Sequence, residues 1–533
     1  MKKNKFSILA LAAPLVISVL SSTACGANKI QQEGPDTYKY DVTVDTRGTT
    51  ITMWTGFGSD MTKELEAILE DFTAKTGIIV NHESKSGYPN LLKAINLAST
   101  SGSYPNIANG YPDHFASYVK SNILLRLDGF LENDAKRGNV DGAYTQNSAR
   151  FGSDGIKLMD YDDFYDDYTV ENETLEFDEK GNGYVLGVPF NKSTEVMVYN
   201  SSLFDWAAKQ TEWKDKIYVP VTWADVKTVC ASIYDLIGDN FMVGDTAGKI
   251  LASDGNWYDS SATASENNRT IILNMSAVQK SDFRPFTYDS TANMFISLVR
   301  SYGGQYTEID KSTSGKGYAV FNNAQTVEAM TMLKDLFDNN YLGIPAIWDE
   351  LYCSTAFKAY KSVMNISSTA GLSNITSAAI PTKCAPVPCK DTNNKYVISQ
   401  GTSLGLFDKG TEKERVASWK LMVYLSQQGN GAFAANTGYF PTCDYSYNSL
   451  EYQQYLDNDL KSNTDILRQE SAKVNSDSYV NDGWVKFVDP GFRGSADIRE
   501  AVDLIPGYLM TDTYGGVQET LDAVYKTISD YTK

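Results

Sequence analysis

The sequence predicts an α/β protein with a largely parallel sheet and more than one hydrophobic core. Its 533 residues exceed the roughly 250–300 residues at which a single core stops growing. Hydrophobic residues make up 42% of the chain and charged residues 21%, the balance of a globular protein. Strand-like and helix-like segments alternate, and such alternation requires crossovers between parallel strands.

The alternation begins after a polar N-terminal region. Thr49–Trp54 is β-branched and apolar, as in a strand. Ser59 or Asp60 provides a helix cap before apolar residues at helical spacing, and Gly77 is a typical helix stop. The next expected elements are a strand at 78–80, a helix at 90–99 and a short strand at 106–108.

Later segments continue the pattern. Thr222–Asp225 and Thr411–Glu414 are capping boxes, and each predicts the start of a helix. A further helix is expected at 326–337, strands at 184–190 and 196–199, and polar insertions or wide loops at 239–270 and 445–480.

The N-terminus has the features of an export signal. Lys2, Lys3 and Lys5 precede the apolar stretch 6–20, which is too short to span a bilayer. Ser22-Thr23-Ala24-Cys25 resembles a bacterial lipobox, which implies cleavage after residue 24 and lipidation of Cys25. The alternative is ordinary secretion with Cys25 as a spare thiol. Residues 25–48 are expected to be a lipid-anchored tether.

Charge and composition exclude several functions. The net charge of −19 repels nucleic-acid phosphates, so no nucleic-acid partner is expected. With only His82 and His114, and no zinc-ligand spacing or phosphate-binding glycine loop, the sequence predicts no metal and no cofactor. Cys384 and Cys389 are near enough in sequence to close a small loop, although buried thiols are the default.

Several short runs resemble the bacterial extracellular solute-binding proteins of ABC importers, of the carbohydrate-uptake type, and in particular the subfamily of the glycerol-3-phosphate-binding protein. In chain order these runs are Met53–Thr55, Gly87–Leu92, Tyr104–Ile107, Val188–Thr194, Val198–Asn200, Thr222–Trp223, Gln400–Leu404, Thr437–Pro441 and Gly491–Arg493.

The resemblance implies two α/β lobes with interleaved chain crossings and a ligand cleft that closes by a hinge motion. The expected ranges are 49–192 and 361–400 for the first lobe, and 193–360 and 401–533 for the second. The implied partners are a small polar ligand, an ABC permease and its ATPase, and the membrane through the lipid anchor. The protein is expected to be a monomer on the outer face of the cell membrane, and not an enzyme.

The resemblance also implies a set of ligand-binding residues. Tyr88 and Tyr439 match ligand tyrosines, Ser193 a contacting serine, and Gly401 a glycine that lets the backbone approach the ligand. Asp113 lies one residue beyond the family's glutamate and can accept hydrogen bonds from hydroxyls. The remaining candidates are Ser368 and Thr369, at a strand end where they can cradle an oxygen, and Arg493, which matches a phosphate-facing arginine.

Five of the candidates have a purely structural alternative, and for Gly401 it is a plain bulge or turn. Tyr88 can be a packing residue at a helix entry, Asp113 a helix N-cap, and Ser193 a turn residue. Arg493 can form a surface or interlobe salt bridge.

Four functions remain open from the sequence. The first is a binding protein for a glycerol phosphate or its diester, and the second is a binding protein for a neutral mono- or oligosaccharide. The third is a lipid-anchored carbohydrate-active enzyme, since glycoside hydrolysis needs only two carboxylates at the right separation. The fourth is a surface adhesin.

Overall fold

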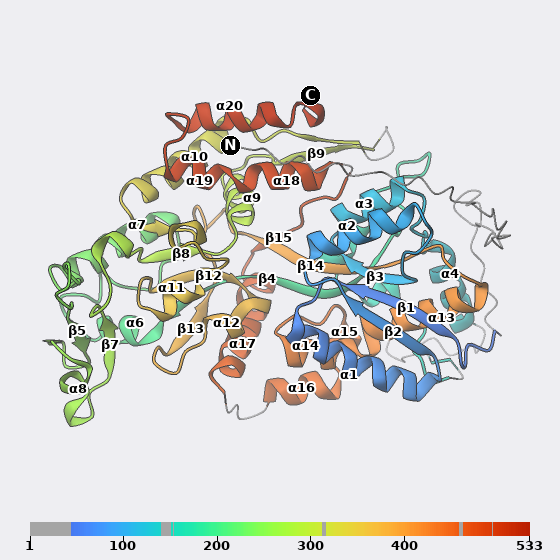
Figure 1. Cartoon of the computed structure of the whole chain (residues 1–533), viewed down its shortest axis with the longest axis horizontal. Coiled ribbons are helices and arrows are strands. Elements are labelled where there is room, and N and C mark those ends of the chain that lie inside the picture. The colour runs from blue at the N-terminus through green and yellow to red at the C-terminus, as the bar shows by residue number, and fades with distance from the viewer. Residues whose placement is uncertain are drawn as a thin grey trace, which may run out of the picture.

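The computed structural model describes residues 44–139, 151–152, 154–311, 316–457, 462–492 and 494–532. It forms two lobes joined by strands that run from one lobe into the other (Figure 1). The signal segment 1–24, Cys25 with most of the tether, and Arg493 lie outside the described residues.

The first lobe begins with strand–helix alternation as the sequence predicts. Its elements are β1 (Thr50–Thr55), α1 (Ser59–Thr76), β2 (Ile79–Ser84), α2 (Tyr88–Ser99), β3 (Ile107–Gly110), α3 (Pro112–Lys120), α4 (Asp128–Asn139) and α5 (Asp166–Thr169). Strand β1 pairs in parallel with both β2 and β3. Gly77 ends α1 with a φ of 70°, a conformation that glycine adopts without strain.

Two long antiparallel strands connect the lobes, β4 (Val188–Asn200) and β14 (Tyr396–Leu406). The expected pair of strands at 184–190 and 196–199 is therefore one continuous strand. Its middle residues do not form a turn, because they are buried and pair with β14 from Asn191 to Thr194.

The second lobe is built on the far ends of these strands. Its elements are α6 (Ser201–Ala207), α7 (Trp223–Ile237), β5 (Ile250–Ala252), β6 (Trp257–Tyr258), α8 (Ser261–Ala264), β7 (Ile271–Asn274), β8 (Phe286–Tyr288), α9 (Thr291–Ser301), β9 (Thr307–Asp310), β10 (Lys316–Ala319), α10 (Ala324–Asp338), β11 (Leu342–Gly343), α11 (Ser354–Lys358), β12 (Met364–Ser368), α12 (Leu372–Ile375) and β13 (Thr382–Ala385). The insertion at 239–270 contains β5, β6 and α8, so it is not simply a wide loop.

After β14 the chain continues in the first lobe, and it later returns to the second lobe. The first elements after β14 are the helices α13 (Glu412–Val423), α14 (Asn430–Thr437), α15 (Asp444–Tyr447) and α16 (Leu450–Asp457). The remaining elements are α17 (Asn463–Lys473), β15 (Val485–Phe487), α18 (Ser495–Asp503), α19 (Ile505–Met510) and α20 (Val517–Thr527). The prediction of an irregular segment at 445–480 is wrong, since α16 and α17 occupy it. The sequences of these two helices are polar and lack a strong apolar stripe. Packing of α16 against α14 and of α17 against β13 stabilises their helical conformation.

The sheet is mixed rather than largely parallel. Its strand order is β11-β8-β12-β4-β14-β3-β1-β2, with β13 on β4 and β15 on β14. The pairs on either side of the centre, such as β1 with β3 and β8 with β12, are parallel. The two connecting strands run antiparallel to their neighbours β3 and β12. This arrangement places one edge of the sheet in each lobe and the connecting strands between them.

Two main hydrophobic cores follow this division. Val188 of β4 and Leu404 of β14 pack in the first core, and Val196 and Ile398 of the same strands pack in the second. The expected lobe ranges differ from this packing after residue 360. Residues 363–385 belong to the second core and 404–433 to the first. We therefore propose lobe boundaries inside β4 and β14.

Two of the local signals for helix starts are confirmed, but the N-cap of α1 is Gly58 without a side-chain capping hydrogen bond, so neither Ser59 nor Asp60 caps that helix. Thr222 and Asp225 form the capping box of α7, and Thr411 and Glu414 that of α13. The five described cysteines are free, so Cys384 and Cys389 form no disulfide. Within the described ranges, no helix is both long and apolar enough to cross a bilayer.

Candidate cleft between the lobes

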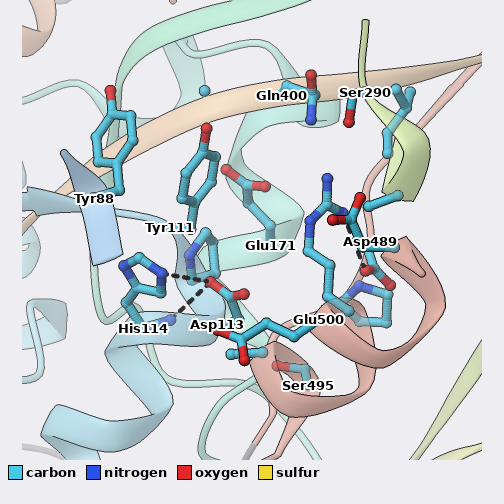
Figure 2. Close-up of a pocket in the computed structure, with 18 of the residues that line it drawn as sticks. Tyr88, Tyr111, Asp113, His114, Glu171, Ser290, Gln400, Asp489, Ser495 and Glu500 are labelled. Carbon is cyan, nitrogen blue, oxygen red and sulfur yellow. Dashed lines mark hydrogen bonds and ion pairs between the residues drawn. The ribbon is translucent and has the colours of Figure 1, made fainter. Parts of the chain in front are cut away.

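A cavity of about 380 Å³ lies between the lobes, beside β14. Figure 2 shows its walls: α2, α3 and the segment at Glu171 from the first lobe, β14 with Gln400 across one side, and α18 with Asp489 from the second lobe. Because both lobes contribute walls, a ligand held here bridges them, and its contacts favour a closed arrangement.

Tyrosine rings form the first-lobe wall. Tyr88 is the first residue of α2, and Tyr111 directly precedes α3. Their ring centroids are 5.0 Å apart in an edge-on arrangement, and Tyr111 meets His114 at 5.6 Å. The Tyr88 ring sits tightly over Gly56, where an added Cβ would lie 2.6 Å from a ring carbon. The packing therefore fixes the orientation of Tyr88.

The hydroxyl of Tyr88 is held by polar neighbours. The side-chain amide of Asn191 on β4 donates a hydrogen bond to it at 3.3 Å. Tyr439 also interacts with Tyr88, and its ring is stacked on Phe433 at 5.9 Å between centroids. Burial raises the pKa of Tyr88 and of Tyr439. Both hydroxyls therefore stay protonated and can donate hydrogen bonds.

Carboxylates line the cavity between the two walls. Asp113 accepts a hydrogen bond from the backbone N–H of His114 at 2.8 Å, and the imidazole Nε2 lies 3.9 Å away (Figure 2). Glu171 is paired with Lys192 of β4, whose ammonium also donates to Ser403 at 3.3 Å. Burial raises the pKa of Glu171, although Lys192 opposes the shift.

The second-lobe wall contains an arginine whose donors are already engaged. Arg499 of α18 lies 3.7 Å from the carboxylate of Asp489 and donates to the side-chain oxygen of Asn293. Gln400 of β14 donates to the same oxygen at 2.9 Å. Burial would lower the pKa of Arg499, but Asp489 acting together with Tyr306, Asp113 and Tyr111 outweighs it, so the pKa is raised and the guanidinium stays charged.

Behind this wall a buried glutamate connects β4 to the second lobe. Glu195 accepts a hydrogen bond from Asn293 at 2.8 Å and another from Tyr288. Burial raises the pKa of Glu195 from 4.5 to about 7, although both hydrogen bonds oppose the shift. The cleft therefore rests on a network whose charge changes near neutral pH.

We expect this network to make stability fall as pH rises. The folded protein holds the Glu195 proton more tightly than the unfolded chain, so this contribution is fully present below pH 4.5 and is lost by about pH 7. The loss is on the order of 3 kcal/mol. Urea denaturation at pH 5, 6, 7 and 8 measures it. Glu195→Gln should make the profile less steep without abolishing it, because the raised pKa of Asp489 acts in the same pH range, whereas a profile as steep as that of the parent protein would contradict the assignment.

Three sequence-predicted residues line the cavity. They are Tyr88, Asp113 and Gly401, while Tyr439 lies behind Tyr88. Gly401 has a φ of 100°, and a Cβ there would lie 1.9 Å from the carbonyl oxygen of Asn191. Only glycine fits this position, because the close approach of β14 to β4 leaves no room for a side chain.

The other described candidates lie at the strand crossing rather than on the cavity wall. The hydroxyls of Ser193 and Ser368 are 3.5 Å apart, and Thr369 accepts a hydrogen bond from the backbone of Thr194 at 3.4 Å. Ser193 is inside β4 and not between two strands, so it is not a turn residue. Arg493 lies outside the described residues.

Sequence reasoning missed several cavity residues. Glu171 follows a polar stretch with no motif, and Arg499 lies on an ordinary amphipathic helix, so neither had a signal. Two other cavity residues had a nearby signal. Gln400 lies within a run that resembles the family, and Tyr111 lies two residues from Asp113, but neither is among the predicted ligand-binding residues. Among the described residues, no cluster of His, Cys, Asp or Glu could hold a metal ion.

Negative charge dominates the cavity lining. One cationic side chain, Arg499, stands among these wall residues against five carboxylates, namely Asp113, Glu171, Asp489, Glu500 and Asp503. Arg499 and Glu171 each already have an oppositely charged partner. The lining therefore favours a neutral or cationic occupant over an anion.

Comparisons with known proteins agree with this geometry. A family model described as "Bacterial extracellular solute-binding protein" matches residues 67–458. Among solved structures, the GacH receptor of Streptomyces glaucescens, determined unliganded and with acarbose, is 16% identical with a TM-score of 0.61, covering 91% of this chain and 99% of that one.

Two further structures are similar to a comparable degree. The Lmo0181 protein of Listeria monocytogenes, in complex with cycloalternan, is 15% identical with a TM-score of 0.60, covering 90% and 98% of the two chains. UgpB of Mycobacterium tuberculosis, in complex with glycerophosphocholine, is 13% identical with a TM-score of 0.61 and the same coverage. These likenesses show the two-lobe fold. No curated protein matches the chain.

Proposed function

Because this chain belongs to the family of bacterial extracellular solute-binding proteins, we propose that its cleft captures a sugar or small oligosaccharide for an ABC importer. Family membership makes it a binding protein that works outside the cytoplasm. The observation that carries the ligand class is the cavity wall itself, where tyrosine rings meet carboxylates and hydroxyls between two lobes.

The wall provides the contacts that a sugar needs. The Tyr88 and Tyr111 rings offer apolar surface to the C–H face of a sugar ring. Carboxylates such as Asp113 accept hydrogen bonds from hydroxyl groups. Ser399 is a largely buried residue of the cavity lining, and its hydroxyl has no hydrogen bond to another described residue, so it is open to a ligand. The three structural neighbours named above were determined in complex with acarbose, cycloalternan and glycerophosphocholine, respectively.

The same wall argues against a glycerol phosphate. A phosphate needs donors or cations that are not already engaged, and Arg499 is bound to Asp489 and Asn293. Bringing a dianion among five carboxylates costs further electrostatic energy. The neutral-sugar function is therefore favoured over the glycerol-phosphate function.

The membrane context is part of the proposal. Lipidation of Cys25 ties the protein to the outer face of the cell membrane. A permease with its ATPase reads the closed, loaded form. The protein acts as a monomer.

We expect a panel of neutral sugars to contain at least one that raises the melting temperature, while sn-glycerol 3-phosphate does not. A sugar at a hundred times its Kd stabilises the fold by about 2.7 kcal/mol. Tyr88→Ala should weaken that binding at least about thirtyfold, as loss of a binding hot spot does. The matched control is Tyr514→Ala, which removes an exposed tyrosine of the second lobe.

Other outcomes would redirect the assignment. A shift with glycerol 3-phosphate alone would contradict the sugar class. Product release from oligosaccharides would favour an enzyme. Binding to a surface partner with no small-molecule shift would favour an adhesin.

A further inference from the structure

Two carboxylates from opposite lobes extend into the same space of the cavity. Asp113 comes from the start of α3 in the first lobe, and Glu500 comes from α18 in the second (Figure 2). The lobes meet closely beside them, because a Cβ on Gly491 would lie 2.7 Å from the backbone of Pro112. Closure of the cleft therefore brings like charges together.

Within the described residues, neither of these two carboxyl groups forms an ion pair with a lysine or an arginine, although the charge of Asp113 also acts on Arg499. The polar contacts of Asp113 are with the backbone N–H of His114 and, at 3.9 Å, with its ring. Glu500 forms no hydrogen bond or ion pair within the described part of the chain. The nearby cations are both committed, since Lys192 pairs with Glu171 and Arg499 pairs with Asp489.

The negative charge of Asp113 acts on two other carboxyl groups of the cavity, those of Asp489 and Glu171. Burial is the main reason that the pKa of Asp489 is raised to about 7, and the negative charge of Asp113 raises it further despite Arg499. The same charge adds to the effect of burial on Glu171. The cavity therefore holds more negative charge than its own cations balance.

An independent feature shows that this space is built for a polar ligand. Ser399 is 6% exposed and lines the cavity, and its hydroxyl has no hydrogen-bond partner within the described residues. This hydroxyl is open to the cavity, so a ligand there can exchange a hydrogen bond with it. The Tyr88 and Tyr111 rings lie on the same side and can face a cation.

We propose that the solute of this cleft is a sugar or related polyol with a protonated amine, and that its ammonium group sits between Asp113 and Glu500. This inference rests on the proposed function and specifies its ligand. The ammonium converts a repulsion between the lobes into two attractions, so binding and closure are coupled. A neutral sugar fills the same cavity but leaves the repulsion in place.

The test compares matched sugars by calorimetric titration at low ionic strength. The pairs are glucose with glucosamine, galactose with galactosamine, and cellobiose with the chitosan disaccharide, and the acetylated forms serve as neutral controls of similar size. We expect the amine to bind about ten- to a hundredfold more tightly than its hydroxyl counterpart in at least one pair. The preference should shrink in high salt.

Variants then assign the preference to the two carboxylates. Glu500→Gln and Asp113→Asn should each reduce the amine-to-hydroxyl affinity ratio about tenfold. Glu70→Gln, which removes an exposed carboxylate of α1, is the matched control and should leave the ratio unchanged. Circular dichroism and melting confirm that each variant is folded.

The possible failures are distinguishable. Neutral sugars that bind as tightly as their amines, or a ratio unaffected by both variants, would overturn the amine assignment and leave the sugar-binding function standing. Stabilisation by CaCl₂ alone that is lost in Asp113→Asn would assign the pair to an inorganic cation and also overturn it. If no sugar of either kind binds, both the inference and the proposed function fail.

Discussion

Replacing Glu171 with alanine is expected to lower the free energy of unfolding by about 3–5 kcal/mol. Glu171 is 5% exposed and its partner Lys192 is 1% exposed, so the substitution leaves a buried ammonium without a counter-charge. The contact with Ser403 does not compensate for this loss. Urea denaturation at constant pH measures the change, and sugar affinity should fall with it because Glu171 also lines the cavity.

A double substitution separates the charge effect from packing. In Glu171→Leu with Lys192→Met no buried charge is left unpaired, so this protein should be more stable than either single variant. Asp338→Ala is the control, since it breaks an exposed pair with Lys334 and should cost at most about 1 kcal/mol. A cost below 1 kcal/mol for Glu171→Ala would show that water reaches the ammonium.

Replacing Gly401 with alanine is expected to reduce both stability and ligand binding. Its φ of 100° alone costs a non-glycine residue about 1–3 kcal/mol. The added Cβ also meets the carbonyl oxygen of Asn191 at 1.9 Å, so β14 must move away from β4. Because these strands carry the connection between the lobes, we expect at least tenfold weaker sugar binding together with a lower melting temperature.

The control for this prediction is another glycine. Gly507 lies inside α19, and nothing lies within 4 Å of the position its Cβ would take. Gly507→Ala should therefore leave binding intact and stabilise the protein by up to about 1 kcal/mol. Equal effects of the two substitutions would mean that the close approach at Gly401 is not needed for the connection between the lobes.

The helices with local signals were predictable because their ends depend on nearby residues. The capping boxes at Thr222 and Thr411 and the stop at Gly77 use hydrogen bonds and backbone angles within a few residues. Helices α16 and α17 were not predictable in this way. Their polar sequences become helical through packing on distant segments, and no local pattern reports that.

The candidate cleft was predictable only in part. The resemblance in short runs pointed to Tyr88 and Gly401, which do line the cavity, and to Tyr439, which supports Tyr88. Glu171 and Arg499 come from segments without a motif, and their importance arises from what lies opposite them. A single sequence carries no record of such distant pairs.

The sequence by itself determined the α/β class, the family and many of the helix boundaries, because these follow from periodicity, capping residues and short runs. Only the tertiary structure decided where the chain crosses between lobes and which charges share the cavity. The reason is physical: hydrogen bonds that cap a helix are local, whereas the pairing of β4 with β14 and the meeting of Asp113 with Glu500 join residues hundreds of positions apart. Such contacts exist only once both lobes have folded.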